Sequence, residues 1–152
     1  MEAGKRKKIA IVSSCGGHLT EVRLLRRFYE PHEFFYVVDD RIILPKDMEG
    51  KTYVATHSER DLRFLVNLWE AWKILRKEKP DLIVSTGAGI LVPFAVFAKV
   101  LRIPVLFLET LNRVYHPSLT ARIMYRLADR FFYQWEPLAK YFPQGECTGP
   151  LF

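Results

Sequence analysis

Short runs of apolar residues alternate along this chain with longer stretches in which apolar positions recur at helical spacing. The apolar runs predict buried strands at residues 9–12, 34–38, 52–55, 82–84, 105–108 and 131–133, with a last short strand at 146–147. The helical spacing predicts a helix that begins near residue 19 and further helices at residues 60–77, 90–101, 118–128 and 137–141. Ser118 is the expected N-cap of the helix that it opens.

This alternation indicates the fold class. Strands that are apolar throughout are buried on both faces, and strands that alternate with helices favour a parallel sheet. We therefore expect an α/β protein whose parallel sheet carries helices on both faces. The charged residues 39–50 include a proline and a glycine, which is typical of an exposed loop. With 152 residues and no repeat or linker, the chain is expected to form a basic segment at residues 1–8 and one domain at residues 9–152.

The charge balance narrows the class of partner. The chain has 23 Lys and Arg against 17 Asp and Glu, and residues 5–8 are all basic. A basic excess suits anionic substrates or an anionic membrane surface. No nucleic-acid recognition motif is present, so we expect no nucleic-acid partner. Two cysteines make no disulfide framework and the N-terminus has no apolar signal region, which favours the cytoplasm.

A glycine-rich turn follows the first predicted strand and leads into a helix. It contains Ser14, Gly16, Gly17 and His18. Free backbone N–H groups at a helix N-terminus suit a phosphate or diphosphate, and glycines let the backbone approach a ligand. His18 closes the turn and is a candidate acid or base. The alternative is a tight turn with an exposed histidine.

Two further strand ends carry small or polar residues. The fourth strand is followed by Thr86, Gly87 and Gly89, and the fifth by Glu109, Asn112 and Arg113. Ligands of open parallel sheets bind beyond the carboxyl ends of the strands, so these residues and the first glycine turn are expected to share one cleft. The alternatives are close helix–sheet packing at the second turn and a solvated loop acid at Glu109.

Two predicted helices are more apolar than one core-facing stripe requires. The helix at 60–77 carries Trp69, Trp72 and Arg76, which is typical of an interfacial membrane helix; the alternative is packing on two sides. The helix at 90–101 is too short to span a bilayer. Arg122, Arg126 and Arg130 recur every four residues on one predicted helix face. This spacing has two interpretations: a solvated charged face, or contact with lipid headgroups or a diphosphate.

Neither a metal site nor a thiol nucleophile is indicated. The remaining histidines, His32, His57 and His116, lie at no recognisable ligand spacing from a carboxylate or a cysteine, so we expect no metal and no cofactor. Cys15 lies at a helix N-terminus, which favours a lowered pKa, but no partner acid or base accompanies it. We therefore interpret Cys15 as incidental.

Four segments together resemble a known family. These are the Ser-x-Gly-Gly-His-x-x-Glu motif at residues 14–21, the Ser-Thr-Gly-Ala-Gly turn at 85–89, the strand that ends in Glu109, and Thr-Gly-Pro at 148–150. They resemble the Rossmann-like, acceptor-binding N-terminal half of a GT-B glycosyltransferase. In particular, they resemble the membrane-recruiting subunit of the two-chain N-acetylglucosaminyltransferase of asparagine-linked glycosylation and its bacterial exopolysaccharide and capsule counterparts. The N-terminal half of the peptidoglycan N-acetylglucosaminyltransferase shares this outline.

The resemblance implies a division of labour. In such enzymes one domain binds a lipid-linked acceptor at the membrane and the other binds the UDP-sugar. A chain of 152 residues has no room for both. The resemblance therefore implies a donor-binding partner chain, a lipid-diphosphate acceptor, N-acetylglucosamine or another hexose as the transferred sugar, and no activity of this chain alone. The eukaryotic subunit begins with a membrane anchor that this sequence lacks, so we expect peripheral binding at the cytoplasmic face.

Within this hypothesis, the Gly16 and Gly17 amides hold the diphosphate with Arg113, and His18 activates the acceptor hydroxyl. Glu109 is the second candidate, as the base or as the group that orients it. The aromatic C-terminal segment is expected to dock the partner, or else to pack in the core. Its members are Tyr133, Trp135, Tyr141, Phe142, Leu151 and Phe152. Two other functions remain open, a stand-alone flavodoxin-like nucleotide-binding module and a non-catalytic membrane adaptor.

Overall fold

Seven parallel strands form one sheet in the computed structural model, which describes residues 5–57 and 62–151. The strand order is β3-β2-β1-β4-β5-β6-β7, and every neighbouring pair is parallel. The strands are β1 (Lys8–Ser13), β2 (Glu33–Asp39), β3 (Thr52–Ala55), β4 (Leu82–Ser85), β5 (Val105–Leu108), β6 (Arg130–Tyr133) and β7 (Glu146–Cys147). The expected α/β class and parallel sheet are confirmed.

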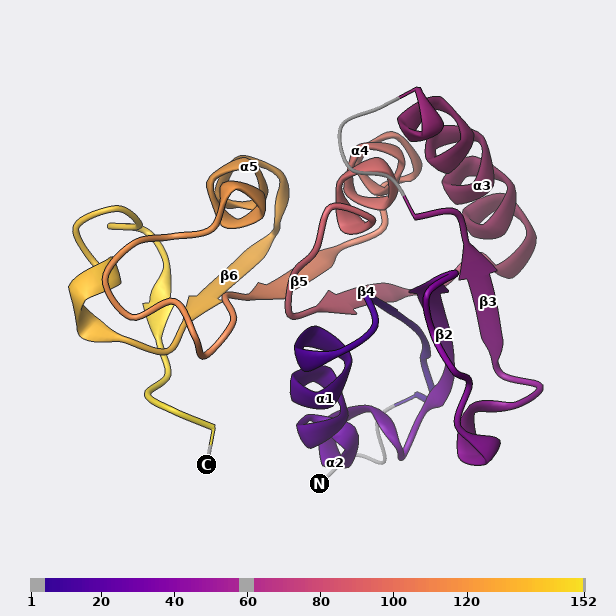
Figure 1. The fold of residues 1–152 in the computed structure, drawn as a ribbon, viewed down its shortest axis with the longest axis horizontal. Helices are drawn as coiled ribbons and strands as arrows, with labels where there is room; N and C mark the ends of the chain where they lie inside the picture. The colour runs from indigo at the N-terminus through magenta and orange to yellow at the C-terminus, as the bar shows by residue number, and fades with distance from the viewer. Residues whose placement is uncertain (1–4, 58–61, 152) are drawn as a thin grey trace.

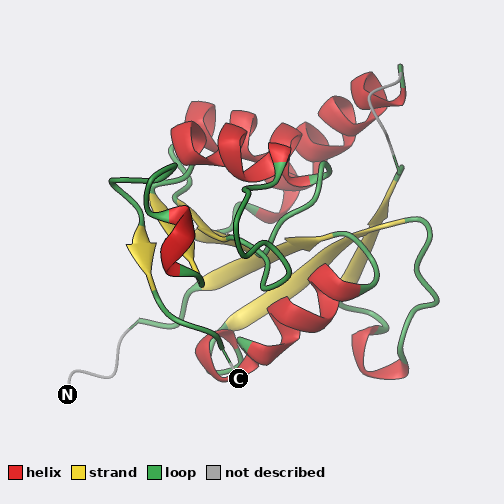
Figure 2. Cartoon of the chain, turned by 60° about the vertical axis from the view of Figure 1, so that its left-hand side comes forward, coloured by secondary structure: helices red, strands yellow, loops and turns green. Residues whose placement is uncertain are grey.

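Helices cover both faces of the sheet. Figure 1 shows three helices on one face, namely α3 (Arg63–Glu78), α4 (Leu91–Leu101) and α5 (Leu119–Leu127). The other face carries α1 (Gly17–Leu24) and α2 (Arg26–Tyr29), as the turned view of Figure 2 also shows. The described residues also form two 3₁₀ turns, η1 (Lys46–Met48) in the loop at 39–50 and η2 (Glu136–Leu138) where a helix at 137–141 was expected. Arg60, the expected first residue of the helix at 60–77, lies outside the described residues.

The core has two halves, one on each face of the sheet. Along β1, Ala10 and Val12 pack under the helices α3 to α5, whereas Ile9 and Ile11 pack under α1 and α2. Successive side chains of a strand point to opposite faces, so a strand buried on both faces is apolar at every position. This double burial explains the continuous apolar runs of the sequence.

The order of the strands determines where a ligand can bind. The chain builds β2 and β3 on one side of β1 and then crosses to β4, β5 and β6 on the other side. Between β1 and β4 the connections therefore leave in opposite directions and a crevice opens at the carboxyl ends. The loops that follow β1, β4 and β5 meet at this crevice.

The last residue of the expected basic segment at 1–8 is already part of the sheet. Lys8 is the first residue of β1, and its ammonium group pairs with Glu33 at 3.2 Å and with Glu78 at 2.5 Å. Residues 1–4 lie outside the described residues. Over the described ranges 5–57 and 62–151, no helix has both the length and the apolar content that a membrane span requires.

Candidate functional site

A pocket of about 690 Å³ opens at the carboxyl ends of β4 and β5. Its polar wall includes His18, Thr110, Asn112 and Arg113, and Gly89 also lines it. Its apolar wall comes from three different helices. These residues are Phe64 of α3, Val92 of α4, and Leu119 and Ile123 of α5. Residues that are 105 positions apart in the chain thus face one cavity, as the shared position at strand ends predicts.

His18 is held in place by the loop after β4. Its Nδ1 lies 3.1 Å from the carbonyl oxygen of Thr86, and the Thr86 hydroxyl donates to the carbonyl of His18 at 2.8 Å. A carbonyl only accepts, so in the neutral imidazole Nδ1 carries the proton and Nε2 keeps a lone pair. An imidazole held in this tautomer is equipped to accept a proton through Nε2.

Gly87 makes room for that imidazole. Its φ of +126° lies in a region that side chains rarely adopt, and an added Cβ would stand 2.9 Å from Cε1 of His18. Ser14, Thr86 and Gly87 are buried behind the pocket and do not line it. Gly87 therefore packs against the His18 imidazole and helps to position it, a contact different from the helix–sheet packing that was the alternative for this turn.

The first glycine turn leaves the N-terminus of α1 open. Gly16, with a φ of +84°, occupies the N-cap position, and no side chain of the described residues caps this end. Gly16 and Gly17 are both exposed, and a Cβ added at either would meet no atom within 4 Å. The first backbone N–H groups of such a helix are available to an anion.

Glu109 is an internal anchor of the loop that follows β5. Only 1% of it is exposed, so the alternative of a solvated loop acid is wrong. Its carboxylate accepts from the Thr110 amide at 3.0 Å, from the Ser118 amide at 2.9 Å and from the Ser118 hydroxyl. Burial raises the pKa of Glu109, which these hydrogen bonds and the charge of Arg113 oppose. Ser118 also caps α5, as expected, because its Oγ accepts from the Ala121 amide at 2.9 Å.

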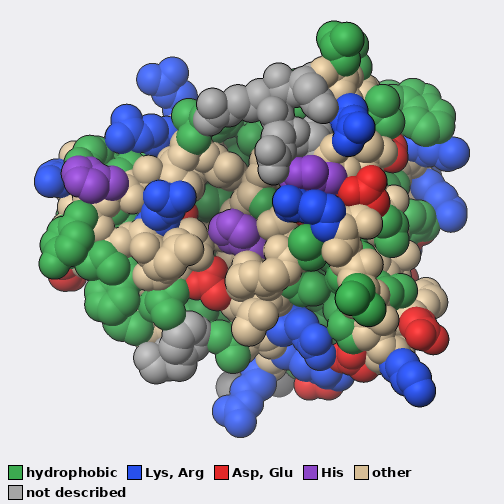
Figure 3. Space-filling model, in the orientation of Figure 1, with side chains coloured by type: hydrophobic (Ala, Val, Ile, Leu, Met, Phe, Trp, Pro, Cys, Tyr) green, Lys and Arg blue, Asp and Glu red, His purple; other side chains and the backbone are tan. Residues whose placement is uncertain are grey.

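Apolar side chains are exposed on and just before α3, the helix that contributes Phe64 to the pocket. Exposed residues on and before the first half of α3 are Leu62, Leu65, Val66 and Trp69. Figure 3 shows hydrophobic side chains standing out over α3, with Lys and Arg side chains beside them. Trp69 is 62% exposed and lies under the Lys73 ammonium, whereas Trp72 is half-buried against Phe97, with ring centroids 5.2 Å apart. Of the two tryptophans among the predicted membrane contacts, Trp69 is the one presented to solvent.

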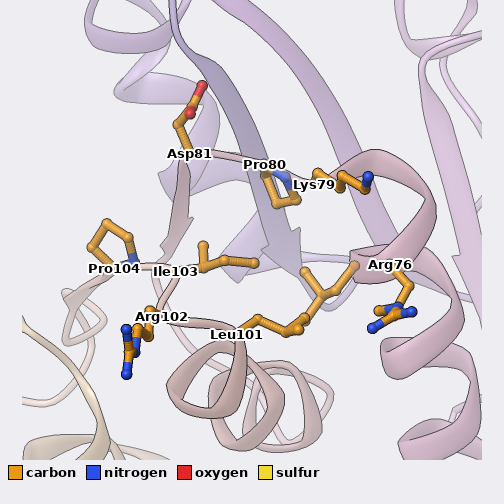
Figure 4. Close-up of a pocket in the computed structure, with 9 residues that line it drawn as sticks. Arg76, Lys79, Pro80, Asp81, Leu101, Arg102, Ile103 and Pro104 are labelled. Carbon is orange, nitrogen blue, oxygen red and sulfur yellow. The ribbon is translucent and has the colours of Figure 1, made fainter.

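Arg76 lies at the opposite end of the sheet. It lines a second cavity of about 670 Å³ before the amino ends of β4 and β5. Figure 4 shows Leu101 and Ile103 between its guanidinium group and that of Arg102. The cavity shares no residue with the pocket around His18. Arg76 therefore does not belong to the candidate site.

Cys15 does not have the lowered pKa expected at a helix N-terminus. Hydrogen bonding to the buried Asp39 carboxylate, together with burial, raises the pKa of the thiol. Burial also raises the pKa of Asp39, but hydrogen bonds from Arg41 and Cys15 outweigh it and hold that pKa below its ordinary value. Asp39 is not among the expected site residues, although its position at the carboxyl end of β2 is the kind of signal that marked the others. In the described part of the chain no three His, Cys, Asp or Glu side chains are grouped to hold a metal.

Comparison with known proteins identifies similar sequences. The family model for "Oligosaccharide biosynthesis protein Alg14 like" matches residues 51–151. The human UDP-N-acetylglucosamine transferase subunit ALG14 is 25% identical over 177 residues, which cover 94% of this chain and 82% of that protein. The UDP-N-acetylglucosamine--N-acetylmuramyl-(pentapeptide) pyrophosphoryl-undecaprenol N-acetylglucosamine transferase of Staphylococcus aureus (strain USA300 / TCH1516) is 32% identical over 98 residues, 64% of this chain and 27% of that enzyme.

Solved structures confirm the fold. MurG of Acinetobacter baumannii superposes with a TM-score of 0.74 at 16% identity, over 86% of this chain and 42% of that one. The UDP-GlcNAc 2-epimerase of Methanocaldococcus jannaschii, solved with UDP-GlcNAc and UDP, gives 0.73 at 16% identity, over 90% and 43%. The chain therefore spans less than half of either structure, and the expected Rossmann-like fold, that of one GT-B half, is confirmed.

Proposed function

The chain belongs to the Alg14-like family of oligosaccharide biosynthesis proteins, and from this premise we propose that it is the acceptor-binding, membrane-recruiting subunit of a two-chain glycosyltransferase. The enzyme moves N-acetylglucosamine or another hexose from a UDP-sugar to a lipid-diphosphate-linked acceptor. A partner chain binds the UDP-sugar, and this chain alone is inactive. It binds peripherally to the cytoplasmic face of the membrane as a single domain, residues 9–152.

The observation that carries the proposal is the two-sided character of the pocket. One wall offers Arg113, Asn112 and His18, the second residue of α1. A cation and a nearby open helix N-terminus suit a diphosphate, although Gly16 and Gly17 do not themselves line the pocket. The other wall is apolar, and its Phe64 belongs to α3, the helix that also exposes Leu65, Val66 and Trp69. A ligand with an anionic end and an apolar end fits both walls. A lipid diphosphate has this character, whereas a free nucleotide does not.

The chemistry assigned to the site is base catalysis. The Gly16 and Gly17 amides and Arg113 hold the diphosphate. Nε2 of His18 takes the proton of the acceptor hydroxyl as its oxygen bonds to the anomeric carbon of the sugar, and UDP leaves with the electrons of the broken bond. The carboxylate of Glu109 is engaged by Thr110 and Ser118. We therefore assign Glu109 to holding the loop after β5, which differs from both roles expected for it, the base or the group that orients the base.

Membrane recruitment is assigned to α3 and its neighbours. Exposed Trp69 and the leucines before it insert at the headgroup level, and the cations Lys73 and Arg76 lie along the same helix. Lys8 contributes little to this contact, because its ammonium group is already paired with Glu33 and Glu78.

The partner is assigned to the C-terminal edge. Tyr133 and Phe142 are buried in the core, so they do not form the interface. Leu151 instead lines an apolar cavity of about 200 Å³ together with Phe28 of α2 and Phe132 of β6. Such a cavity offers a partner an apolar anchor point. Phe152 lies outside the described residues.

Transfer assays with the reconstituted complex test the proposal. This chain is co-purified with its UDP-sugar-binding partner and supplied with UDP-N-acetylglucosamine and a short-chain polyprenyl-diphosphate sugar. His18→Ala is expected to lower kcat about 10²–10⁴-fold. His116→Ala, in an exposed loop outside the pocket, is the control and leaves kcat unchanged.

The competing functions give different results in the same preparation. A flavin spectrum or tight nucleotide binding by the isolated chain would favour the flavodoxin-like module. Full transfer by the partner chain alone would favour the non-catalytic adaptor. Equal rates for wild type and His18→Ala would remove the base assignment and leave the rest of the proposal standing.

A further inference from the structure

Glu21 is a buried acid of α1 that the proposed chemistry does not use. It lies three residues after His18 on the same helix, and only 7% of it is exposed. Its Oε1 accepts a hydrogen bond of 2.5 Å from the backbone amide of Leu111, 90 residues further along the chain. Leu111 belongs to the loop between β5 and α5. Glu21 therefore links the helix that carries His18 to the loop that carries Asn112 and Arg113.

Both backbone polar groups of Leu111, its N–H and its carbonyl, are hydrogen-bonded to side chains. Its N–H donates to Glu21, and its carbonyl accepts from the indole N–H of Trp135 at 2.6 Å. The next two residues along the loop, Asn112 and Arg113, line the pocket and are exposed. The backbone of Leu111 therefore positions Asn112 and Arg113, because the loop continues directly from this hydrogen-bonded residue.

The second carboxylate oxygen of Glu21 indicates that this acid has a functional role. Oε2 is buried and has no hydrogen-bond partner in the described part of the chain. A buried carboxylate oxygen without a partner destabilises the fold, since it has lost its water and gained nothing. A leucine of similar volume avoids that cost. An acid in this place is typical of a residue that serves a site at the expense of stability.

We propose that Glu21 is a positioning residue that sets the loop of Asn112 and Arg113 against His18. The helix α1 then holds two groups in a fixed relation: the imidazole locked to Thr86 after β4, and the carboxylate locked to Leu111 after β5. Through this relation Glu21 determines the distance between the base and the cation that receives the acceptor diphosphate. The inference rests on the proposed function for its catalytic consequence but not for the loop geometry.

The first test is made on the isolated full chain and needs no enzyme activity. In Glu21→Leu, amide hydrogen exchange of residues 111–113 is expected to speed up at least tenfold, while the unfolding midpoint stays at or above that of wild type. Glu21→Gln keeps an acceptor for the Leu111 amide and should restore slow exchange. Arg23→Gln, on the same helix but paired with Asp47 at the surface, is the matched control. A lowered midpoint with unchanged exchange would show that Glu21 has only a structural role.

The second test uses the reconstituted transferase. Glu21→Leu is expected to raise KM for the polyprenyl-diphosphate acceptor about 10–100-fold, while KM for the UDP-sugar stays within twofold. Trp135→Phe removes the other hydrogen bond to Leu111 and should reproduce the acceptor effect in a chain whose Glu21 is intact. Equal rises in both KM values, or a fall in kcat alone, would overturn the positioning role.

The two tests separate two kinds of failure. If the wild-type complex transfers no sugar, the proposed function is wrong, and the exchange experiment still decides whether Glu21 holds the loop. If the wild-type complex is active and Glu21→Leu behaves as wild type in both tests, Glu21 is not a positioning residue, and the proposed function stands.

Discussion

At the scale of single residues, the site depends on how His18 is held. Two hydrogen bonds tie it to Thr86, and the missing side chain of Gly87 leaves space for its ring. The imidazole has little freedom to turn away. A base that is already oriented loses less entropy in the reaction than one that must first be ordered.

Gly87→Ala is therefore expected to displace the imidazole. The methyl group would stand 2.9 Å from Cε1 of His18, on a backbone whose φ of +126° disfavours any side chain. We expect a stability loss of about 1–3 kcal/mol and transfer that is about 10–100-fold slower in the reconstituted complex.

Gly50→Ala is the matched control, because Gly50 also has a positive φ, +74°, but its added Cβ meets no atom within 4 Å. It should lose stability without losing activity. Equal activity of the two variants would mean that the position of His18 does not limit the reaction.

Glu109 gives a prediction about pH. Burial raises its pKa, so the folded protein holds this proton more tightly than the unfolded chain does. The stability that this proton contributes is complete below the ordinary glutamate pKa and is lost as the pH rises through the raised folded pKa. Urea unfolding from pH 4 upward should show wild-type stability falling relative to that of Glu109→Gln, which has no proton to lose. A constant difference between the two proteins across this range would contradict the prediction.

The sequence predicted several site residues but not the reasons for their positions. Packing of the core does not require polar residues beyond the end of a strand, so His18, Asn112 and Arg113 were predicted as site residues. All three line the pocket. Glu21 was visible only as one letter of a motif. Its hydrogen bond to Leu111 spans 90 residues, and no local pattern reports a contact across that separation.

At the scale of the elements, α3 has two apolar sides with different roles. One side buries Ala71, Ile74 and Leu75 against the sheet, and Trp72 packs on Phe97 of α4. Another side exposes Trp69 and the leucines near the start of the helix. The excess of apolar residues in this helix therefore combines the two interpretations that the sequence left open, packing on two sides and an exposed apolar surface.

This difference separates the two tryptophans experimentally. Trp69→Glu is expected to weaken sedimentation with phosphatidylglycerol vesicles at least tenfold, because an exposed apolar contact is lost, and to leave the unfolding midpoint unchanged. Trp72→Glu is expected to lower the midpoint, because it places a charge against Phe97. High salt should weaken the wild-type binding. A Trp69→Glu protein that sediments like wild type would move the membrane contact to another surface.

The elements were predicted well where burial is two-sided. All seven strands lie at or within two residues of their expected positions, because a short, continuous apolar run between turn residues is typical of a strand that is buried on both faces. The expected helix at 137–141 is the 3₁₀ turn Glu136–Leu138, since only Leu138 of that turn is buried and Pro137 stands in its first turn. Short segments bury too few side chains to show a periodicity.

At the scale of the whole molecule, the two faces of the sheet are covered unequally. Three helices pack on one face, while α1 and α2 cover mainly β1 and β2 on the other (Figure 1). Beside them, Leu106 and Phe132 of β5 and β6 line the apolar cavity that Leu151 borders. This is the surface to which we assign the donor-binding chain.

Leu151→Asp is expected to reduce co-purification of the partner at least tenfold, since a charge would enter an apolar contact. Deleting residues 149–152 should have the same effect. The unfolding midpoint of the isolated chain should change little. Ile43→Asp, at a side chain that is 95% exposed in a loop, is the control and should not change the yield. Full recovery of the partner by the truncated chain would place the interface elsewhere.

The long-range contacts of the site also have a consequence for folding. His18 meets Thr86 across 68 residues, and Glu21 meets Leu111 across 90. Closing such long loops has an entropic cost, which contacts repay only when β4 and β5 have joined β1. During synthesis α1 leaves the ribosome early and packs on β1 and β2, but His18 and Glu21 gain their partners in the loops only after residues 86 and 111 have followed. Ligand binding should therefore arise late in refolding, in a single step, when the centre of the sheet is complete.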